Sequence, residues 1–333
     1  MATPKLRVGL VGAGMVSRHH LAAWAKIAGA EVVAIADPQL ARGRERAADF
    51  GIGRVFEAAD QLVDEMQPDA LDIAAPVEHH GDLCRLAADR GIAILCQKPL
   101  AGTCEDARRI VHDVAGRVRF MVHENWRFRP PYRRIRSWID DQVIGDIGLV
   151  RLSVRASGFV TDADGLMPGL VRQPFLASLP RFLVFELLVH HLDVLRWLIG
   201  PLAVSTAHLG RLSGAIRAED TAAIALVGRH GLPVLIDACY CVHGAPDHVV
   251  DNLEIIGTKG TISLSDTNLS LTGARTASMS WAFDALYDDA YEGALREFVT
   301  GLLKDRAFET EAGDNLHVLQ LVEDIYAAAG WSG

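Results

Sequence analysis

Residues 8–17 read VGLVGAGMVS and residues 32–37 read VVAIAD, and these two stretches decide the fold class of the chain. They predict, in order, a short apolar strand, a glycine turn, a helix, a second apolar strand and an acid. A bound dinucleotide needs that order, because the turn brings backbone close to the pyrophosphate and the helix N-terminus offers free N–H groups and a positive dipole end. This part of the chain therefore predicts a strand–helix–strand unit that binds a dinucleotide.

Five positions here are expected to contact the dinucleotide. Gly12 permits the tight turn, and Gly14 lets the backbone approach the pyrophosphate. Met15 and Val16 open the helix whose N-terminus supplies the free N–H groups. Asp37 follows at the spacing of the acid that binds the ribose hydroxyls.

A structural glycine turn that binds nothing is the alternative, and Ser17 replaces the third glycine of the motif. Ser17 is still small enough for close packing of helix and strand, and the strand and acid that follow favour binding. Asp37 would repel a 2′-phosphate and Pro38 brings no compensating cation, so NAD is predicted in preference to NADP. Arg42, about one helical turn further on, is the residue that could reach such a phosphate.

The size and composition of the chain limit its class. Its 333 residues suggest about two domains, and with half of them apolar the core needs no disulfides. The five cysteines and the histidines show no spacing of metal ligands, so no metal is expected. A net charge of −9 argues against nucleic acid as a partner. No signal peptide and no segment as long as a membrane span are recognised, so a reducing cytoplasm is the expected location.

The pattern of predicted strands and helices changes near Glu124, and we place the domain boundary there. Residues 1–123 alternate strands with helices, the pattern of a doubly wound parallel sheet of the Rossmann type. Residues 124–333 contain longer β-type runs, which predict an open, mostly antiparallel mixed sheet in an α+β domain that binds substrate and forms oligomers. Two helices at about 286–303 and 313–329 end the chain. The β-type runs are 147–159, 202–210, 221–228, 232–242 and 251–257.

A helix predicted around Glu186, His190 and Asp193 is apolar except for one polar stripe. The spacings of these three residues nearly complete whole helical turns, so they share one narrow face, whereas His191 points elsewhere. One interpretation is a hydrogen-bonded network of the core. The other is that His190 is an acid–base residue, since the pKa of a histidine lies near working pH.

Lys98 follows an apolar strand at 92–96 and precedes Pro99, which favours extended backbone before it. Ligands of a doubly wound sheet bind outside the carboxyl ends of the strands, and Lys98 lies there. From position alone, an exposed loop lysine is the simpler interpretation. A lysine beside a substrate hydroxyl would instead stabilise a developing alkoxide.

Several motifs together give a resemblance that extends over nearly the whole chain. The chain resembles the glucose-fructose oxidoreductase, inositol dehydrogenase and MocA family of NAD(P)-dependent oxidoreductases. This resemblance implies a dehydrogenase that acts on CH–OH groups. The motifs are the glycine turn, Pro76 and His80 after the fourth strand, Gln97-Lys98-Pro99, the NWRFRP of residues 125–130, and the helix with Glu186, His190 and Asp193.

The resemblance also implies roles for individual residues. In such proteins the lysine of a Glu-Lys-Pro motif and the histidine of an Asp-x-x-x-His helix meet at the nicotinamide, which carries over to Lys98 and His190. Pro76 and His80 match positions near the cofactor. Homodimers or homotetramers assembled through the sheet of the second domain are implied as well, and the apolar alternation at 221–227 fits a face that a partner covers.

Two positions depart from the family pattern. Gln97 stands where the family usually has Glu. Glu186 stands where many sugar dehydrogenases of the family have Asp, which changes the reach of the carboxylate by one methylene beside the reacting carbon. The identity of the substrate therefore does not transfer directly from the resemblance.

The expected reaction is NAD-dependent oxidation of a secondary alcohol of a sugar, polyol or related cyclic compound. His190 takes the hydroxyl proton while the hydride moves from carbon to the nicotinamide, and Lys98 orients and polarises the oxygen. Glu186 holds His190 in the right tautomer or bonds a neighbouring hydroxyl, and Asp193 is expected to bind substrate.

Arginines gather at the domain junction, and Arg127 is the one expected to bind substrate. The cluster is a solvated helix face, a subunit contact, or a cleft that holds a carboxylate or phosphate, since arginine binds either in bidentate fashion. The third interpretation predicts an acidic sugar. The cluster comprises Arg127, Arg129, Arg133, Arg134 and Arg136, interleaved with Trp126, Phe128, Tyr132 and Trp138.

Two other functions stay open at this point. Within enzymes, relatives of the family recycle a bound nucleotide while they reduce and reoxidise a sugar, or act on dihydrodiols. Outside enzymes, a relative that regulates a sugar pathway binds nucleotide without turnover. The presence of both Lys98 and His190 argues against such a regulator, because a sensor has no need of a pair for proton transfer.

Overall fold

Six parallel strands form the sheet of the first unit in the computed structural model, which describes residues 5–332. Their order in the sheet is β3-β2-β1-β4-β5-β6, the order of a doubly wound dinucleotide-binding fold. The prediction of a parallel Rossmann sheet is therefore confirmed. The strands are β1 (Leu6–Val11), β2 (Ala30–Ala36), β3 (Val55–Phe56), β4 (Ala70–Ile73), β5 (Ala93–Gln97) and β6 (Phe120–His123).

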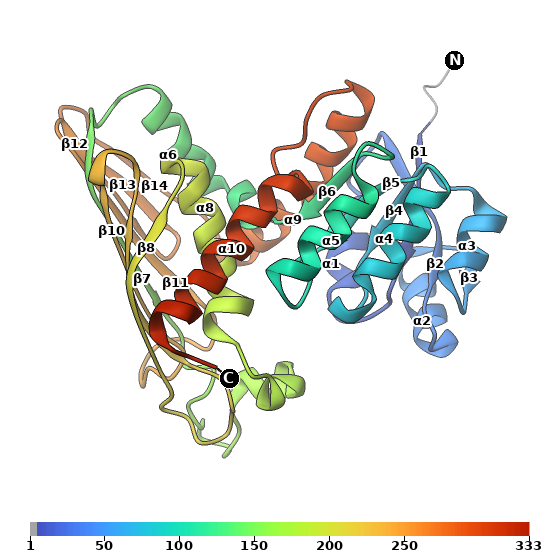
Figure 1. The fold of residues 1–333 in the computed structure, drawn as a ribbon, viewed down its shortest axis with the longest axis horizontal. Helices are drawn as coiled ribbons and strands as arrows, with labels where there is room; N and C mark the ends of the chain where they lie inside the picture. Colours follow the sequence, from blue (N-terminus) through green and yellow to red (C-terminus); the bar gives the residue numbers. More distant parts are fainter. Residues whose placement is uncertain (1–4, 333) are drawn as a thin grey trace. The chain divides into compact units, whose positions relative to one another are not determined.

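Helices connect these strands, and α4 and α5 lie side by side along the sheet (Figure 1). Thr103 caps the N-terminus of α5, because its Oγ1 atom accepts a hydrogen bond from the backbone N–H of Asp106 at 3.1 Å. The helices and helical turns are α1 (Ser17–Trp24), α2 (Leu40–Phe50), α3 (Ala59–Met66), η1 (Val77–His79), α4 (His80–Asp89), α5 (Cys104–Val114) and η2 (Trp126–Phe128).

The first unit is not continuous in sequence. It comprises residues 5–129 and 284–319, so the chain returns to it after building most of the second unit. Helix α9 (Phe283–Leu303) supplies Leu295 and Phe298, both 0% exposed, to the core that also contains Val8 and Met121. The single boundary predicted near Glu124 differs from this division, because the apolar face of α9 is buried against the first sheet rather than within the second unit.

The second unit, residues 130–283 and 320–332, is built on eight strands in the order β14-β13-β12-β11-β7-β10-β9-β8. Only β7 and β10 pair in parallel, so the predicted mostly antiparallel mixed sheet is confirmed. The strands are β7 (Ile147–Arg155), β8 (Ala203–Gly210), β9 (Thr221–Val227), β10 (Pro233–Cys239), β11 (Val250–Gly257), β12 (Gly260–Ser265), β13 (Asn268–Gly273) and β14 (Ala277–Ser280).

Side chains on this sheet alternate between the two faces. In β9 and β10 the buried set includes Ile224, Leu226 and Ile236, whereas Val227 and Leu235 are 40% and 45% exposed. The buried set packs beneath helices of the same unit, and α6 and α8 lie on one side of the sheet (Figure 1). The helical segments here are α6 (Pro130–Asp140), α7 (Pro168–Arg172), η3 (Pro174–Ser178), η4 (Leu183–Leu188), α8 (Val189–Ile199), η5 (Arg229–Gly231) and the end of α10 (Ala312–Ala329).

Within residues 5–332, none of the helices combines the length and the apolar character needed to cross a membrane.

Candidate cofactor and active site

The two glycines of the turn after β1 differ, because the backbone requires glycine at Gly12 and leaves open space at Gly14. Gly12 has a φ of +99°, and a Cβ atom there would lie 2.5 Å from the carbonyl oxygen of Ala74. A Cβ atom at Gly14 would meet nothing within 4 Å. The open space lies just before the N-terminus of α1, where Met15 is exposed and Val16 is the last residue before the helix. The turn therefore has the room and the helix end that a pyrophosphate needs.

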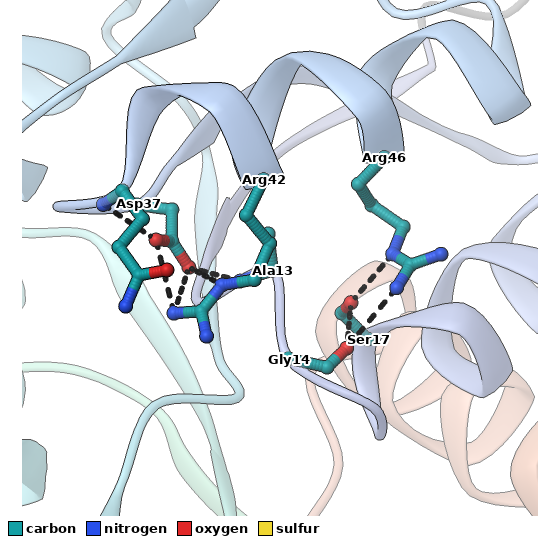
Figure 2. Close-up of polar contacts among 7 residues, drawn as sticks. Ala13, Gly14, Ser17, Asp37, Arg42 and Arg46 are labelled. Atoms are coloured by element: carbon teal, nitrogen blue, oxygen red, sulfur yellow. Dashed lines mark hydrogen bonds and ion pairs between the residues drawn. The ribbon is translucent and has the colours of Figure 1, made fainter.

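Asp37, at the end of β2, closes this turn (Figure 2). Its carboxylate is 1% exposed and accepts hydrogen bonds from the backbone N–H groups of Ala13 at 2.7 Å and Gln39 at 2.8 Å. Arg42 of α2 lies over the same carboxylate, with a nitrogen–oxygen distance of 3.0 Å. The acid and the cation that were predicted to decide between NAD and NADP are thus an ion pair.

Arg46 is a residue of this site that the sequence did not reveal. It is 8% exposed, and its Nε atom donates to the Oγ atom of Ser17 at 3.1 Å. The Ser17 hydroxyl in turn donates to the carbonyl oxygen of Gly14 at 2.6 Å (Figure 2). Burial lowers the pKa of Arg46, and Asp49 lies 3.2 Å from its guanidinium. The serine at the third motif position therefore links α2 to the turn, which a glycine could not do.

His80 joins the loops that follow β4 and β5. Its ring nitrogens lie 3.0 Å from the carbonyl oxygen of Ala75 and 3.1 Å from that of Leu100. Burial lowers the pKa of His80, and the contacts with these two carbonyl oxygens oppose that shift. Pro76 is exposed at the start of η1, and Lys98 is half-buried in the loop after β5. His80 thus lies between the two loops in which cofactor contacts are predicted.

The polar stripe of the second unit begins in a π-helical turn. Glu186 is half-buried in η4, whereas His190 and Asp193 are 7% and 1% exposed in α8. The expectation of one narrow face assumed α-helical turns throughout, and that part is wrong for η4, because a π-helix bonds each residue to the fifth one along the chain. Turns of this kind recur at functional sites.

Glu219, which the sequence did not single out, caps this turn. Its carboxylate accepts hydrogen bonds from the backbone N–H groups of Phe182 at 3.2 Å and Val184 at 2.9 Å. The hydroxyl of Tyr326 donates to the same carboxylate at 2.5 Å. Glu219 is 0% exposed, and burial raises the pKa of its carboxyl group. The start of the segment that carries Glu186 is therefore held by a buried acid.

His191, the neighbour of His190 in α8, bonds to the sheet of the second unit. His191 is 1% exposed, and its Nε2 atom lies 2.8 Å from a carboxylate oxygen of Asp251 in β11. The hydroxyl of Tyr132 donates to the other oxygen of Asp251 at 2.8 Å. His191 thus ties α8 to α6 and to the sheet.

Arg127 lies in the first unit and is 3% exposed. It donates to the carbonyl oxygen of Glu309 at 2.6 Å, and Asp314 lies 3.7 Å away. Arg136 belongs to the second unit, where it donates to the carbonyl oxygen of Trp197 at 2.5 Å. The arginine cluster of the sequence is therefore divided between the two units.

Two models of known protein families match this chain. The model of an oxidoreductase family with an NAD-binding Rossmann fold matches residues 6–123. The model of the C-terminal domain of the glucose-fructose oxidoreductase, inositol dehydrogenase and MocA family matches residues 132–263. The chain therefore belongs to this family of NAD-binding oxidoreductases.

Individual relatives narrow the class. The chain is 34% identical to a D-apiose dehydrogenase of Paraburkholderia graminis over 98% of its own length and 88% of that protein. It is 30% identical to an inositol 2-dehydrogenase of Saccharopolyspora erythraea, covering 96% of this chain and 92% of the other. An oxidoreductase of Agrobacterium radiobacter, crystallised with NAD⁺, L-tartaric acid and magnesium, has a TM-score of 0.87 and 28% identity over 98% of this chain and 96% of that chain.

These findings confirm the resemblance and the class of enzyme. The chain is an NAD-dependent oxidoreductase that acts on CH–OH groups of sugar-like compounds, in a family whose relatives are named as sugar and inositol dehydrogenases. An enzyme is thereby favoured over a regulator that binds nucleotide without turnover.

Proposed function

We propose that this protein oxidises a CH–OH carbon of a cyclic sugar or polyol, with D-apiose and myo-inositol as the first substrates to test. The match to a D-apiose dehydrogenase over nearly the full length of both chains is the observation that carries this choice. The match to an inositol 2-dehydrogenase supports the second candidate.

The first unit supplies the residues that would hold NAD. The open space at Gly14 would take the pyrophosphate against the N-terminus of α1, with Met15 and Val16 beside it. Asp37, already tied into the turn, and Arg42 would lie toward the ribose, and the negative charge of Asp37 supports a preference for NAD over NADP. NAD, when bound, accepts the hydride from the substrate carbon.

The remaining roles concern proton transfer and orientation. His190 takes the proton of the reacting hydroxyl, because histidine is the commonest general base in enzymes. Lys98 orients that hydroxyl and stabilises the developing negative charge on its oxygen. Glu186 bonds His190 or a neighbouring hydroxyl, and Asp193 contributes to substrate binding. Pro76 and His80 shape the loops next to Lys98.

An acidic substrate is a second candidate. The Agrobacterium radiobacter relative was crystallised with L-tartaric acid, which is a hydroxy acid. Arg127 would then pair with the substrate carboxylate, although its guanidinium already bonds Glu309 and lies near Asp314. Arg127→Ala should raise the KM for sugar acids and leave the KM for neutral sugars unchanged. Equal KM values for both classes in this variant would remove the role of Arg127.

A homodimer or homotetramer formed through the outer face of the eight-stranded sheet is also proposed. Val227 and Leu235 are 40% and 45% exposed there, and both side chains are apolar. Leu235→Asp should reduce the mass measured by light scattering at micromolar concentration. A monomeric wild type would contradict the proposal. A reducing cytoplasm as the location fits the five cysteines, none of which forms a disulfide.

The main experiment measures NADH formation with D-apiose, myo-inositol, levoglucosan, sugar acids and dihydrodiols, with NAD and NADP in parallel. The blank is the double variant Lys98→Ala, His190→Ala. We expect turnover of a cyclic sugar that this blank lacks. Redox recycling predicts a different result, namely exchange between a sugar and its oxidised form without net NADH. NADH binding without turnover of any of these compounds would contradict the proposed function.

The two histidines of α8 provide a matched pair for the same assay. His190→Ala should lower kcat by roughly 10²- to 10⁴-fold, the usual contribution of a general base. His191→Ala should instead lower stability by about 2 kcal/mol, because it removes a buried hydrogen bond to Asp251. Equal losses of kcat in both variants would contradict the assignment of His190 as the base.

A further inference from the structure

A buried group of polar side chains surrounds Gln97, at the end of β5 and directly before Lys98. We call it the Gln97 cluster. Its members come from three strands and two helices of the first unit, and none is more than 9% exposed. The cluster comprises His20 and Trp24 of α1, Asp72 of β4, Gln97 of β5, His123 of β6 and Tyr291 of α9.

The orientation of the Gln97 amide follows from one contact. The backbone N–H of Lys98 donates to the Oε1 atom of Gln97 at 2.8 Å. A backbone N–H can only donate, so the amide oxygen must face Lys98 and the NH₂ group must face the other way. That NH₂ group lies 2.9 Å from the Nε2 atom of His20 and 3.3 Å from the Nδ1 atom of His123.

The tautomer of His20 follows in turn. An NH₂ group only donates, so the Nε2 atom of His20 accepts and the ring proton is on Nδ1. The Nδ1 atom then donates to the Oδ2 atom of Asp72 at 2.8 Å, and the Nε1 atom of Trp24 donates to the same oxygen at 2.7 Å. Asp72 therefore fixes the ring of His20, His20 fixes the amide of Gln97, and Gln97 holds the backbone of Lys98.

Aromatic rings pack against one another within the cluster. The rings of His20 and His123 are 4.3 Å apart, and that of Tyr291 lies 4.9 Å from His123. The hydroxyl groups of Tyr291 and Tyr287 are 3.2 Å apart, and burial raises the pKa of Tyr291 well above its usual value. Hydrogen bonds in such a low-dielectric interior hold their partners more rigidly than the same bonds in water.

We propose that Gln97 is a positioning residue for Lys98, and that His20 and Asp72 fix Gln97. The proposal rests on the role of Lys98 in the proposed function. Lys98 is half-buried in the loop that follows β5, and its side chain extends from the backbone that Gln97 holds. An anchored N–H at this residue limits where the ammonium group can lie relative to the substrate hydroxyl.

A purely structural role for the cluster makes a different prediction. It would lower stability when Gln97 is replaced, with no special relation to Lys98. The test therefore compares Gln97→Leu in two backgrounds, the wild type and Lys98→Met. A positioning role predicts that kcat falls by roughly 10- to 100-fold in the wild type and by less than about twofold in Lys98→Met, because the group being positioned is already gone.

Three further variants make the experiment specific. Gln97→Glu keeps an oxygen for the N–H of Lys98 and should restore most of the kcat lost in Gln97→Leu. Gln97→Asn keeps the amide but shortens its reach, so its kcat should fall. This variant replaces Gln97→Leu in the test if the leucine variant does not fold. Gln61→Leu changes an exposed glutamine of α3 and should have no effect. The KM for NAD should stay within about twofold in all of them, because the glycine turn is untouched.

A second measurement does not depend on turnover. Amide hydrogen exchange at Lys98, followed by NMR, should be slow in the wild type and much faster in Gln97→Leu or Gln97→Asn. The ¹⁵N spectrum of His20 should show a proton on Nδ1 and none on Nε2. Equal exchange at Lys98 in all variants, or equal losses of kcat in both backgrounds, would overturn the proposal. If the wild type oxidises no sugar, the proposed function fails, and the exchange and ¹⁵N measurements still decide whether Gln97 anchors Lys98.

Discussion

Two buried carboxylates, Asp37 in the first unit and Glu219 in the second, both hold a turn of the backbone in place, but their side-chain partners differ. Each accepts hydrogen bonds from two backbone N–H groups at the start of a helical segment or turn. Asp37 also has Arg42 at 3.0 Å, whereas the side chain that donates to Glu219 is the neutral hydroxyl of Tyr326. A buried charge is costly without a cation, and burial raises the pKa of Glu219.

The comparison teaches how each site is held in place. The partners of Asp37 are Ala13, Gln39 and Arg42, all within 24 residues of it in the sequence, so short-range contacts hold this turn. The partners of Glu219 come from the turn at 182–184 and from Tyr326 near the end of the chain. The geometry of the segment with Glu186 and His190 therefore depends on long-range packing of the second unit.

Removing the Glu219 carboxylate should have the largest effect on stability. Glu219→Ala leaves the N–H groups of Phe182 and Val184 and the hydroxyl of Tyr326 without their acceptor, which should cost about 3 kcal/mol. Urea denaturation measures this cost, and kcat should fall because η4 loses its cap. Asp324→Ala, an exposed change on α10, is the control. A loss below about 1 kcal/mol would show that the cap is dispensable.

The two glycines of the turn should separate stability from cofactor binding. Gly12→Ala should destabilise the protein by about 2 kcal/mol, because alanine is strained at φ +99° and its Cβ atom would meet the carbonyl of Ala74. Gly14→Ala should leave the melting temperature unchanged and weaken NADH binding by about tenfold or more, since its methyl group would occupy the space for the pyrophosphate.

Wild-type affinity of Gly14→Ala for NADH, measured by fluorescence titration, would contradict the proposed pyrophosphate site. A lower melting temperature of the same variant would show that the turn, and not the cofactor, needs glycine there.

The ion pair of Asp37 and Arg42 should set the preference for NAD. Asp37→Ala removes the negative charge and leaves the guanidinium, so the ratio of the Kd for NADH to the Kd for NADPH should rise by about tenfold, or 1.4 kcal/mol. Arg42→Ala should shift this ratio in the opposite direction. An unchanged ratio in both variants would mean that Asp37 acts only on the backbone of the turn.

A pH dependence of stability should give the smallest effect. Burial raises the pKa of Glu219 above its ordinary value of 4.5, so the folded protein keeps a proton that the unfolded chain releases. This contribution is fully present below pH 4.5 and is lost as the pH rises through the raised pKa. Glu219→Gln does not titrate, so its stability relative to wild type should improve from pH 5 to pH 8. A constant difference would show that Glu219 is ionised throughout.

Features that depend on residues close together in the sequence were mostly predicted correctly, whereas features that depend on distant residues mostly were not. The sheet of the first unit and the conformation of Gly12 were predictable, because a tight turn between a strand and a helix needs a positive φ there. The position of Lys98 after a strand end was equally accessible. The π-helical turn at Leu183–Leu188 was not predictable, since its residues other than Glu186 are apolar and fit an α-helical pattern as well.

Gln97 illustrates the limit most clearly. The sequence marked it as a departure from the family pattern and offered no reason for it. The partners of its side chain come from α1 and β6, which meet only when the sheet is assembled. The same holds for Arg46, whose bond to Ser17 joins α2 to the turn.

The sequence by itself determined the family, the dinucleotide fold, the glycine turn with its acid, and the residue types available for proton transfer. These depend on local backbone preferences and short spacings, which a linear pattern records. Only the tertiary structure decided that α9 belongs to the first unit, that Glu219 and Tyr326 cap the turn before Glu186, and that Gln97 holds Lys98. Those arrangements depend on which distant side chains are buried together, and hydrogen bonding in a dry interior then permits few alternatives.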